Sequence, residues 1–157
     1  MYIQVYSEPE HNQCMRPEAI KKKLSSQFKT SRLIACMSDN QFVAFLMFTS
    51  INSDKYFPET LKNNFPKSSI YIAEVMVAKP HRAKGIATTM LEMVFEVCKK
   101  ESCNDVFIRV RSSNLGALQL YEKLGFAAID TIEQPTLNAA GTAYYPMKKT
   151  YLHKSMV

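Results

Sequence analysis

Residues 82–88 combine basic side chains, small residues and the start of a helical pattern. The segment reads Arg-Ala-Lys-Gly-Ile-Ala-Thr, and an amphipathic pattern over 86–98 begins directly after Gly85. The first backbone N–H groups of a helix have no partner inside it, and the helix dipole makes that end positive. Small residues let a ligand approach those groups, while Arg82 and Lys84 add positive charge. The segment therefore predicts a site for an anion such as a pyrophosphate, although it is neither a Walker A loop nor a dinucleotide-binding fingerprint.

Glu74 is a second candidate for chemistry, because it lies inside an apolar run over 70–78 that predicts a strand. Lys79-Pro80 ends that run, since proline cannot donate to a strand ladder. A carboxylate among apolar residues is costly unless it has a partner or faces a cleft. Glu74 is therefore a candidate general base, or else a glutamate at the rim of the sheet or paired with an arginine. His81 is an alternative base by its chemistry, although its place in the basic turn predicts a surface position.

The elements expected around these residues follow in the order β-α-β-β-β-α-β-α-β-β. Strands are expected over 2–6, 33–37, 42–48, 70–78, 106–110, 126–132 and 142–152, and helices over 17–28, 86–98 and 114–124. Such alternating elements predict an α/β fold with a mixed, mostly antiparallel central sheet of six to seven strands and helices on both faces. The stretch 49–69 contains Pro58, Pro66 and many polar residues, so we expect a long loop with a short helix near 59–64.

Length and composition are typical of a single globular domain over residues 1–157, with 46% hydrophobic and 22% charged residues. The first residues show no basic leader, and no apolar run approaches the length of a membrane span. We therefore expect a cytoplasmic protein that does not insert into a membrane.

The cysteine spacing and the net charge bear on whether the protein binds a metal or nucleic acid. The four cysteines at 14, 36, 98 and 103 show no metal-ligand spacing, which predicts no metal site, and Cys98 falls on the apolar face of the central helix. The net charge of +6 favours anionic ligands. The basic residues are scattered rather than gathered in a tail, which argues against nucleic acid as the ligand.

Two motifs together resemble those of the GNAT family of N-acetyltransferases. Arg82-x-x-Gly85-x-Ala87 is similar to the acyl-CoA-binding motif of that family, Gln/Arg-x-x-Gly-x-Gly/Ala. The segment from Asn114 to Phe126, Asn-Leu-Gly-Ala-Leu-Gln-Leu-Tyr-Glu-Lys-Leu-Gly-Phe, is similar to the downstream signature Asn-x-x-Ala-x-x-Leu-Tyr-x-x-x-Gly-Phe. Both occur in the family's order, and the resemblance covers about 69 to 132.

The resemblance implies transfer of an acetyl group from acetyl-CoA directly to a primary amine, without a metal. Tyr121 would act as the acid for the leaving thiolate, and Glu74 would take the proton of the amine, directly or through water. The implied acetyl-CoA-binding residues are Met76, Val77, Arg82, Ala83, Lys84, Gly85, Ile86, Ala87, Thr88, Asn114 and Tyr121. In the family the sheet splays between its fourth and fifth strands, here 70–78 and 106–110, to admit the pantetheine arm. Without the resemblance, Tyr121 could be a core aromatic and Asn114 a helix cap.

The acceptor amine is less well defined by the sequence. We expect a small molecule; a protein or peptide amine is the alternative, as is a non-catalytic acyl-CoA-binding or nucleic-acid-associated module, and a homodimer is left open. Val110 to Asn114 resembles the ribosomal-protein alanine acetyltransferases, which usually carry a glutamate where this chain has Arg109. Arg109 could therefore suit an acceptor with a carboxylate or phosphate, or point to solvent. The aromatic residues of 49–69 could line the acceptor entrance or pin the loop to the surface.

Overall fold

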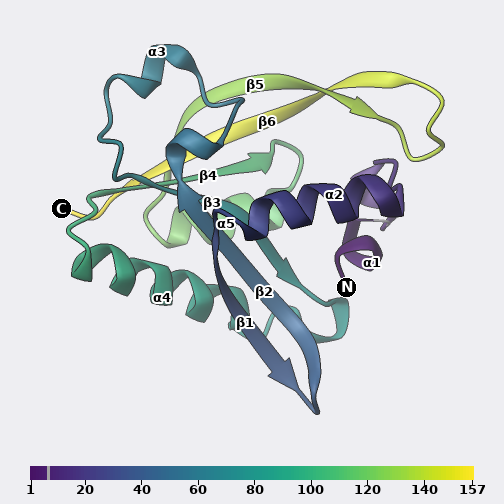
Figure 1. The fold of residues 1–157 in the computed structure, drawn as a ribbon, viewed down its shortest axis with the longest axis horizontal. Coiled ribbons are helices and arrows are strands. Elements are labelled where there is room, and N and C mark those ends of the chain that lie inside the picture. Colours follow the sequence, from purple (N-terminus) through teal and green to yellow (C-terminus); the bar gives the residue numbers. More distant parts are fainter. Residues whose placement is uncertain (7) are drawn as a thin grey trace.

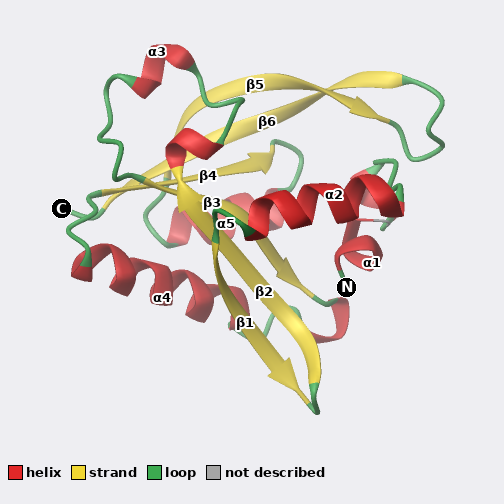
Figure 2. Ribbon diagram, viewed as in Figure 1, coloured by secondary structure: helices red, strands yellow, loops and turns green. Residues whose placement is uncertain are grey.

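A computed structural model describes residues 1–6 and 8–157, and its centre is a sheet of six strands in the order β1-β2-β3-β4-β6-β5 (Figures 1 and 2). The strands are β1 (Arg32–Ser38), β2 (Gln41–Ser50), β3 (Ile70–Val77), β4 (Asp105–Arg111), β5 (Ala127–Leu137) and β6 (Tyr144–Ser155). β3 and β4 are parallel, and the other neighbouring strands are antiparallel. The expected mixed, mostly antiparallel α/β sheet is confirmed.

Helices cover both faces of this sheet. They are α1 (Tyr2–Tyr6), α2 (Pro17–Phe28), α3 (Glu59–Lys62), α4 (Ile86–Lys100) and α5 (Leu115–Lys123), with short 3-10 turns at η1 (Pro9–His11), η2 (Ile51–Ser53) and η3 (Lys79–His81). α4 and α5 pack on one face and bury the largest apolar cluster. α1, α2 and the segment 51–69 pack on the other face, where two smaller clusters lie. In Figure 1, α2 crosses in front of the sheet and α5 lies behind it.

The first segment is a helix, whereas the sequence pattern predicted a strand over 2–6. Tyr2 and Val5 are both buried, and a helix brings these two positions to one face. That face packs against Ile20 of α2 and Met76 of β3. The prediction was wrong because burial against another helix and the sheet face, rather than strand pairing, decides the conformation of these residues.

The last two strands are longer than predicted. β5 continues to Leu137 and pairs with β6 from Tyr144 onwards, so most of the predicted loop over 133–141 is part of a hairpin. Pro135 lies opposite Pro146 in this pairing, on the edge strand β5 and on the part of β6 that extends beyond β4. Proline is tolerated at both places because neither position needs an N–H donor toward a further strand.

A bulge in β3 changes which side chains face each side of the sheet. In the pairing with β2, Met47 lies opposite Glu74 and Phe48 lies opposite Ile72, so Ala73 is the extra residue. Ile72 before the bulge and Val75 after it both pack on the α4 side. The strand alternation therefore shifts by one residue, and Glu74 is turned toward α1 and α2.

The sheet splits between β3 and β4 directly after this point. The two strands pair only from Ile70 to Ile72, with Val106 to Ile108 as partners. Further along, β3 stays paired with β2 as far as Val77, and β4 stays paired with β6 as far as Arg111. The backbone edges of β3 and β4 thus face each other across an opening, as the resemblance implied.

The segment 51–69 is pinned to the sheet by its aromatic side chains. Phe57 is 2% exposed, and its ring packs edge-on against Phe107 of β4 and Tyr151 of β6, with centroids 5.2 and 5.4 Å away. Phe65 packs against the same Phe107 ring at 4.7 Å. These rings hold a long connection on the face of the sheet rather than line the opening.

We expect Phe57→Ala to lower the free energy of unfolding by about 3–5 kcal/mol, because it leaves a cavity beneath the segment. Tyr144→Ala is the matched control, since Tyr144 is 73% exposed and its loss should change stability by less than about 0.5 kcal/mol. Urea denaturation of both variants measures the difference. Equal small effects would show that the segment is not packed on the sheet.

Candidate active site

A cleft of about 890 Å³ opens where β3 and β4 part. Its walls are β3 beyond the bulge, the end of β4, the segment around Gly85, the first turns of α5, Lys149 of β6 and the chain around Tyr6. A large cleft with converging polar groups is the usual form of a ligand site. Of the predicted acetyl-CoA-binding residues, all except the exposed Lys84 line it.

The turn before α4, residues 82–88, is the cradle in which the sequence predicts an anion to bind. Gly85 is the N-cap of α4 and has φ +79°, a left-handed conformation that favours glycine. A Cβ at Gly85 would meet no atom within 4 Å, so the space in front of the helix is open. Ile86, Ala87 and Thr88 begin the helix and line the cleft, where their backbone N–H groups cannot be satisfied within α4. The helix end is thus placed to bind an anion.

Arg82 fixes this turn rather than offering a free charge. Its Nε donates to the carbonyl oxygen of Val77 at 2.9 Å, which ties the turn to the end of β3. Its Nη1 and Nη2 donate to the two carboxylate oxygens of Glu8 at 2.9 and 2.8 Å. These hydrogen bonds lower the pKa of Glu8. No local pattern marked Glu8 as a partner, because it lies 74 residues from Arg82 along the chain.

Glu74 is buried and held by three donors from the N-terminal helices. Tyr2 and Tyr6 donate their hydroxyls to Oε1 and Oε2 at 3.2 and 2.9 Å, and the Lys23 ammonium donates to Oε1 at 2.6 Å. The partner of the carboxylate is therefore a lysine, where the sequence offered an arginine as one alternative. Glu74 also lines the cleft, so it has both a partner and access to a ligand.

The surroundings of Glu74 shift the pKa values of its three partners. Burial and the Glu74 charge raise the pKa of Tyr2 to about 12, and the same two causes raise the pKa of Tyr6. Burial works to lower the pKa of Lys23, but the attraction of Glu74 outweighs it and the pKa is raised. Both tyrosines thus keep their protons, and Lys23 keeps its charge, at neutral pH.

Tyr121 is a buried residue of α5 whose side chain lines the cleft. Burial, followed by the Glu74 charge, raises the pKa of its hydroxyl, so the phenol stays protonated. Within residues 1–6 and 8–157 this hydroxyl makes no hydrogen bond, and it remains available to a ligand. Protonated Tyr121 and the Glu74 carboxylate therefore belong to one electrostatic cluster in the cleft.

The ends of α5 hold Tyr121 in place. Asn114 caps the helix, because its Oδ1 accepts from the backbone N–H of Ala117 at 3.2 Å. At the other end Gly125 adopts φ +85°, and the N–H of Phe126 reaches the carbonyl of Tyr121 itself at 3.0 Å. Asn114 thus has the structural role that its residue type indicated, and it also borders the cleft.

Arg109 neither points to solvent nor offers an unpaired charge. Its Nη1 lies 3.2 Å from Oδ1 of Asp54 and donates to the Tyr151 hydroxyl at 2.9 Å. Its guanidinium also lies 4.9 Å from the centre of the Tyr56 ring. Asp54, on the segment 51–69, is 5% exposed. Arg109 was expected either to bind an anionic acceptor or to point to solvent. It instead forms a buried ion pair with Asp54 that helps to hold this segment.

The sequence pattern missed several residues of the cleft. Tyr2 and Tyr6 are spaced like two positions on one helical face, a signal that the strand prediction overlooked. Lys149 of β6 lines the cleft and is half-buried, and nothing in its local sequence marked it. His81 is half-buried at the cleft rather than on the open surface.

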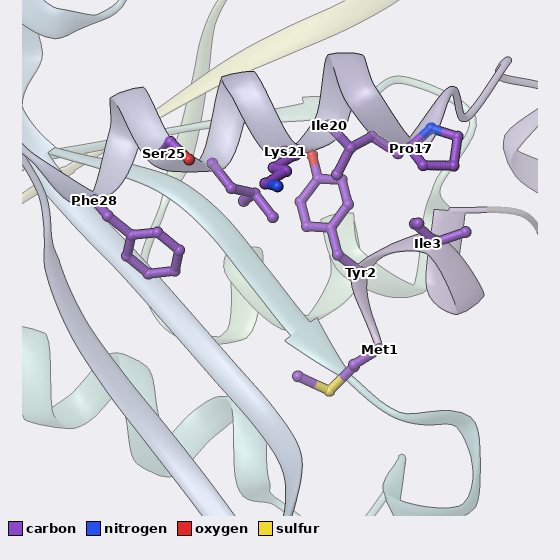
Figure 3. A pocket seen from close by; sticks show the side chains of 9 residues that line it. Met1, Tyr2, Ile3, Pro17, Ile20, Lys21, Ser25 and Phe28 are labelled. Atoms are coloured by element: carbon purple, nitrogen blue, oxygen red, sulfur yellow. The ribbon is translucent and has the colours of Figure 1, made fainter.

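A second hollow of about 450 Å³ lies between α1 and α2 on the outside of the molecule. Figure 3 shows Tyr2 reaching toward α2 beside Ile20, with Ile3 and Phe28 at the rim. Its polar side chains besides Tyr2 are Lys21 and Ser25, which do not form an acid–base pair. The hollow borders Tyr2 and lacks the acid–base groups of the larger cleft.

Two further findings concern metals and membranes. Glu8, Glu10 and His11 bring one potential ligand atom each within 4.8 Å of one another, but both oxygens of Glu8 are bound by Arg82. Among the described residues, no helix is both long enough and apolar enough to cross a bilayer.

Solved structures share this fold at low sequence identity. The ribosomal-protein-S18-alanine N-acetyltransferase of Escherichia coli superimposes with a TM-score of 0.66 at 16% identity, over 98% of this chain and 87% of that chain. A GNAT family acetyltransferase of Elizabethkingia anophelis with acetyl-CoA bound gives a TM-score of 0.62 at 17% identity, over 86% and 82% of the two chains.

Sequence comparison identifies the family. N-alpha-acetyltransferase 50 of Danio rerio is 36% identical over 63 residues, which are 40% of this chain and 38% of that protein. The chain spans about 30 to 41% of the length of the curated relatives it matches first. The model of the acetyltransferase (GNAT) family matches residues 2–126, which include the cradle, Glu74 and Tyr121. The chain therefore belongs to the GNAT family of acetyltransferases.

Proposed function

We propose that this protein transfers an acetyl group from acetyl-CoA directly to a primary amine. The observation that carries the proposal is the split between β3 and β4, which brings an anion cradle, a protonated phenol and a carboxylate into one cleft. The cradle would bind the pyrophosphate, the phenol would protonate the leaving group, and the carboxylate would remove the amine proton.

The residues present fit acetyl-CoA as the cosubstrate. The open N-terminus of α4 at Gly85 would hold the pyrophosphate, and the unpaired edge of β3 at Met76 and Val77 would pair with the pantetheine arm. Arg82 would support the site by keeping the turn in position. Acetyl-CoA supplies the acetyl group as a thioester, whose C–S bond breaks as the new C–N bond forms.

The side chains of the cleft would handle the protons. The amine must be neutral when it attacks, and Glu74 would take its proton directly or through water. Among residues 1–6 and 8–157, Oε2 of Glu74 accepts from Tyr6 alone, which leaves acceptor capacity for a ligand. Tyr121 would donate its proton toward the sulfur as the thiolate leaves, so the net products are an amide and free coenzyme A. A module that only binds acyl-CoA would need neither group.

We propose a small molecule as the acceptor, as the sequence suggested, and a peptide N-terminus as the second candidate. The names of two similar proteins favour the second candidate. The Danio rerio protein is an N-alpha-acetyltransferase, and the Escherichia coli structure is a ribosomal-protein-S18-alanine N-acetyltransferase. A panel of small amines and short peptides, assayed with acetyl-CoA by release of free thiol, distinguishes the two.

We expect Gly85→Asp to weaken acetyl-CoA binding by about a hundredfold or more, because it adds strain at a positive φ and a negative charge beside the phosphates. Gly85→Ala is the matched control, since it adds the strain alone and should weaken binding by about tenfold or less. Isothermal titration measures both Kd values. No binding by the unmodified protein, or equal losses in the two variants, would contradict the cradle.

Tyr121→Phe should lower kcat by about a hundredfold or more while changing the Kd for acetyl-CoA little, because it removes the proton donor and keeps the ring. Tyr144→Phe on the exposed hairpin should change neither quantity. Steady-state kinetics and titration of both variants provide the comparison. Unchanged turnover in Tyr121→Phe would remove Tyr121 from the acid role.

A further inference from the structure

Lys149 is a cation in the cleft that the proposed chemistry does not use. It lies on β6 opposite Arg111 of β4, on the β4 side of the split, whereas Glu74 lies on the β3 side. Tyr151 is two residues further along β6 and therefore lies on the same face of the sheet as Lys149. The Tyr151 hydroxyl donates a hydrogen bond to Asp54. Lys149 and Glu74 therefore face α1, α2 and the segment 51–69 rather than α4 and its anion cradle.

No carboxylate neutralises Lys149 within the described chain. Among residues 1–6 and 8–157, the ion pairs around the cleft join Lys23 to Glu74, Arg82 to Glu8 and Arg109 to Asp54, and none includes Lys149. Each of those carboxylates is thus already matched with its own cation.

The neighbours of Lys149 make its charge costly. Arg111 holds two neutral partners, the carbonyl oxygens of Glu10 and His11, so it brings a further positive charge to this end of the cleft. Burial, and then the nearby Arg109 guanidinium, lower the pKa of Lys149 to about 8. A half-buried ammonium beside guanidinium groups is stabilised when an anion binds next to it.

We propose that Lys149 binds a carboxylate or phosphate group of the acceptor, which makes the acceptor a primary amine that also carries an anionic group. This inference rests on the proposed function, because it names the substrate class of the same site. The amine would lie between Glu74 and Tyr121, and the anion would lie across the split at Lys149. The anion-binding role that the sequence offered for Arg109 thus falls to Lys149, since Asp54 neutralises Arg109.

Matched acceptors test this charge requirement and distinguish its sources. The small-molecule pairs are β-alanine with β-alaninamide, and 2-aminoethyl phosphate with ethanolamine. The peptide pair begins with Ala-Asp or Ala-Asn and carries an amidated C-terminus. For each pair, kcat/KM of the anionic member is divided by kcat/KM of the neutral member. This ratio is then compared between variants, so that differences in basicity between the two amines cancel.

We expect the unmodified protein to prefer the anionic member of at least one pair, and Lys149→Gln to lower that ratio by about tenfold. Lys149→Arg keeps the charge and should keep the preference. Lys148→Gln is the matched control, because Lys148 is an exposed lysine on the same strand that does not line the cleft, and its ratio should not change.

The preference should also fall as pH rises from about 7 to about 9, because Lys149 loses its charge above its pKa of about 8. The groups whose charges bear on Lys149 are Arg109 and Arg111 of β4, Lys23 of α2 and Glu74 of β3. Of these, the arginines stay charged throughout this range.

Four results would overturn the inference, and they show whether the proposed function fails with it. If amines are acetylated but the ratio is the same in Lys149→Gln, or does not change with pH, the role of Lys149 is wrong while acetyl transfer stands. If the protein prefers the neutral members, the acceptor class is wrong. If acetyl-CoA binds but no acceptor is acetylated, the proposed function and the inference fall together.

Discussion

The parting of β3 and β4 after Ile72 is the constraint on which the rest of the structure depends. A continuous ladder would close the middle of the sheet and bury the edges of both strands. The bulge at Ala73 acts at the same place, because it turns Glu74 toward α1 and α2 while Val75 stays in the core on the α4 side. The parting thus leaves a cleft in the sheet, and the bulge places a carboxylate beside it.

Three ion pairs then fasten separate parts of the chain around this passage. Lys23 and Glu74 join α2 to β3, Arg82 and Glu8 join the turn before α4 to the N-terminal segment, and Arg109 and Asp54 join β4 to the segment 51–69. The carboxylate side chain of each pair is only 3 to 14% exposed, so removing its cation would leave a largely buried negative charge uncompensated. The pairs therefore serve position more than net stability, and none of the three engages Lys149.

Local patterns in the sequence predicted the parts of the site that depend on nearby residues. The helix start after Gly85, the Asn114 cap and the stop at Gly125 all depend on residues within a few positions, and the structure contains each of them. Anion binding at the cradle stays a prediction. The partners of Glu74 could not be found this way, since Tyr2 and Lys23 lie 72 and 51 residues away. The same holds for α1, whose helical conformation depends on packing against α2 and β3.

Hydrogen exchange with and without acetyl-CoA tests most directly whether the split is the binding site. The account predicts slower exchange of backbone amides in the cradle at 84–89 and along the split at 73–77 and 109–111. Exchange at the far end of the β5–β6 hairpin and in the hollow between α1 and α2 should stay unchanged. Protection confined to that hollow or hairpin, or no protection at saturating acetyl-CoA, would contradict the central claim.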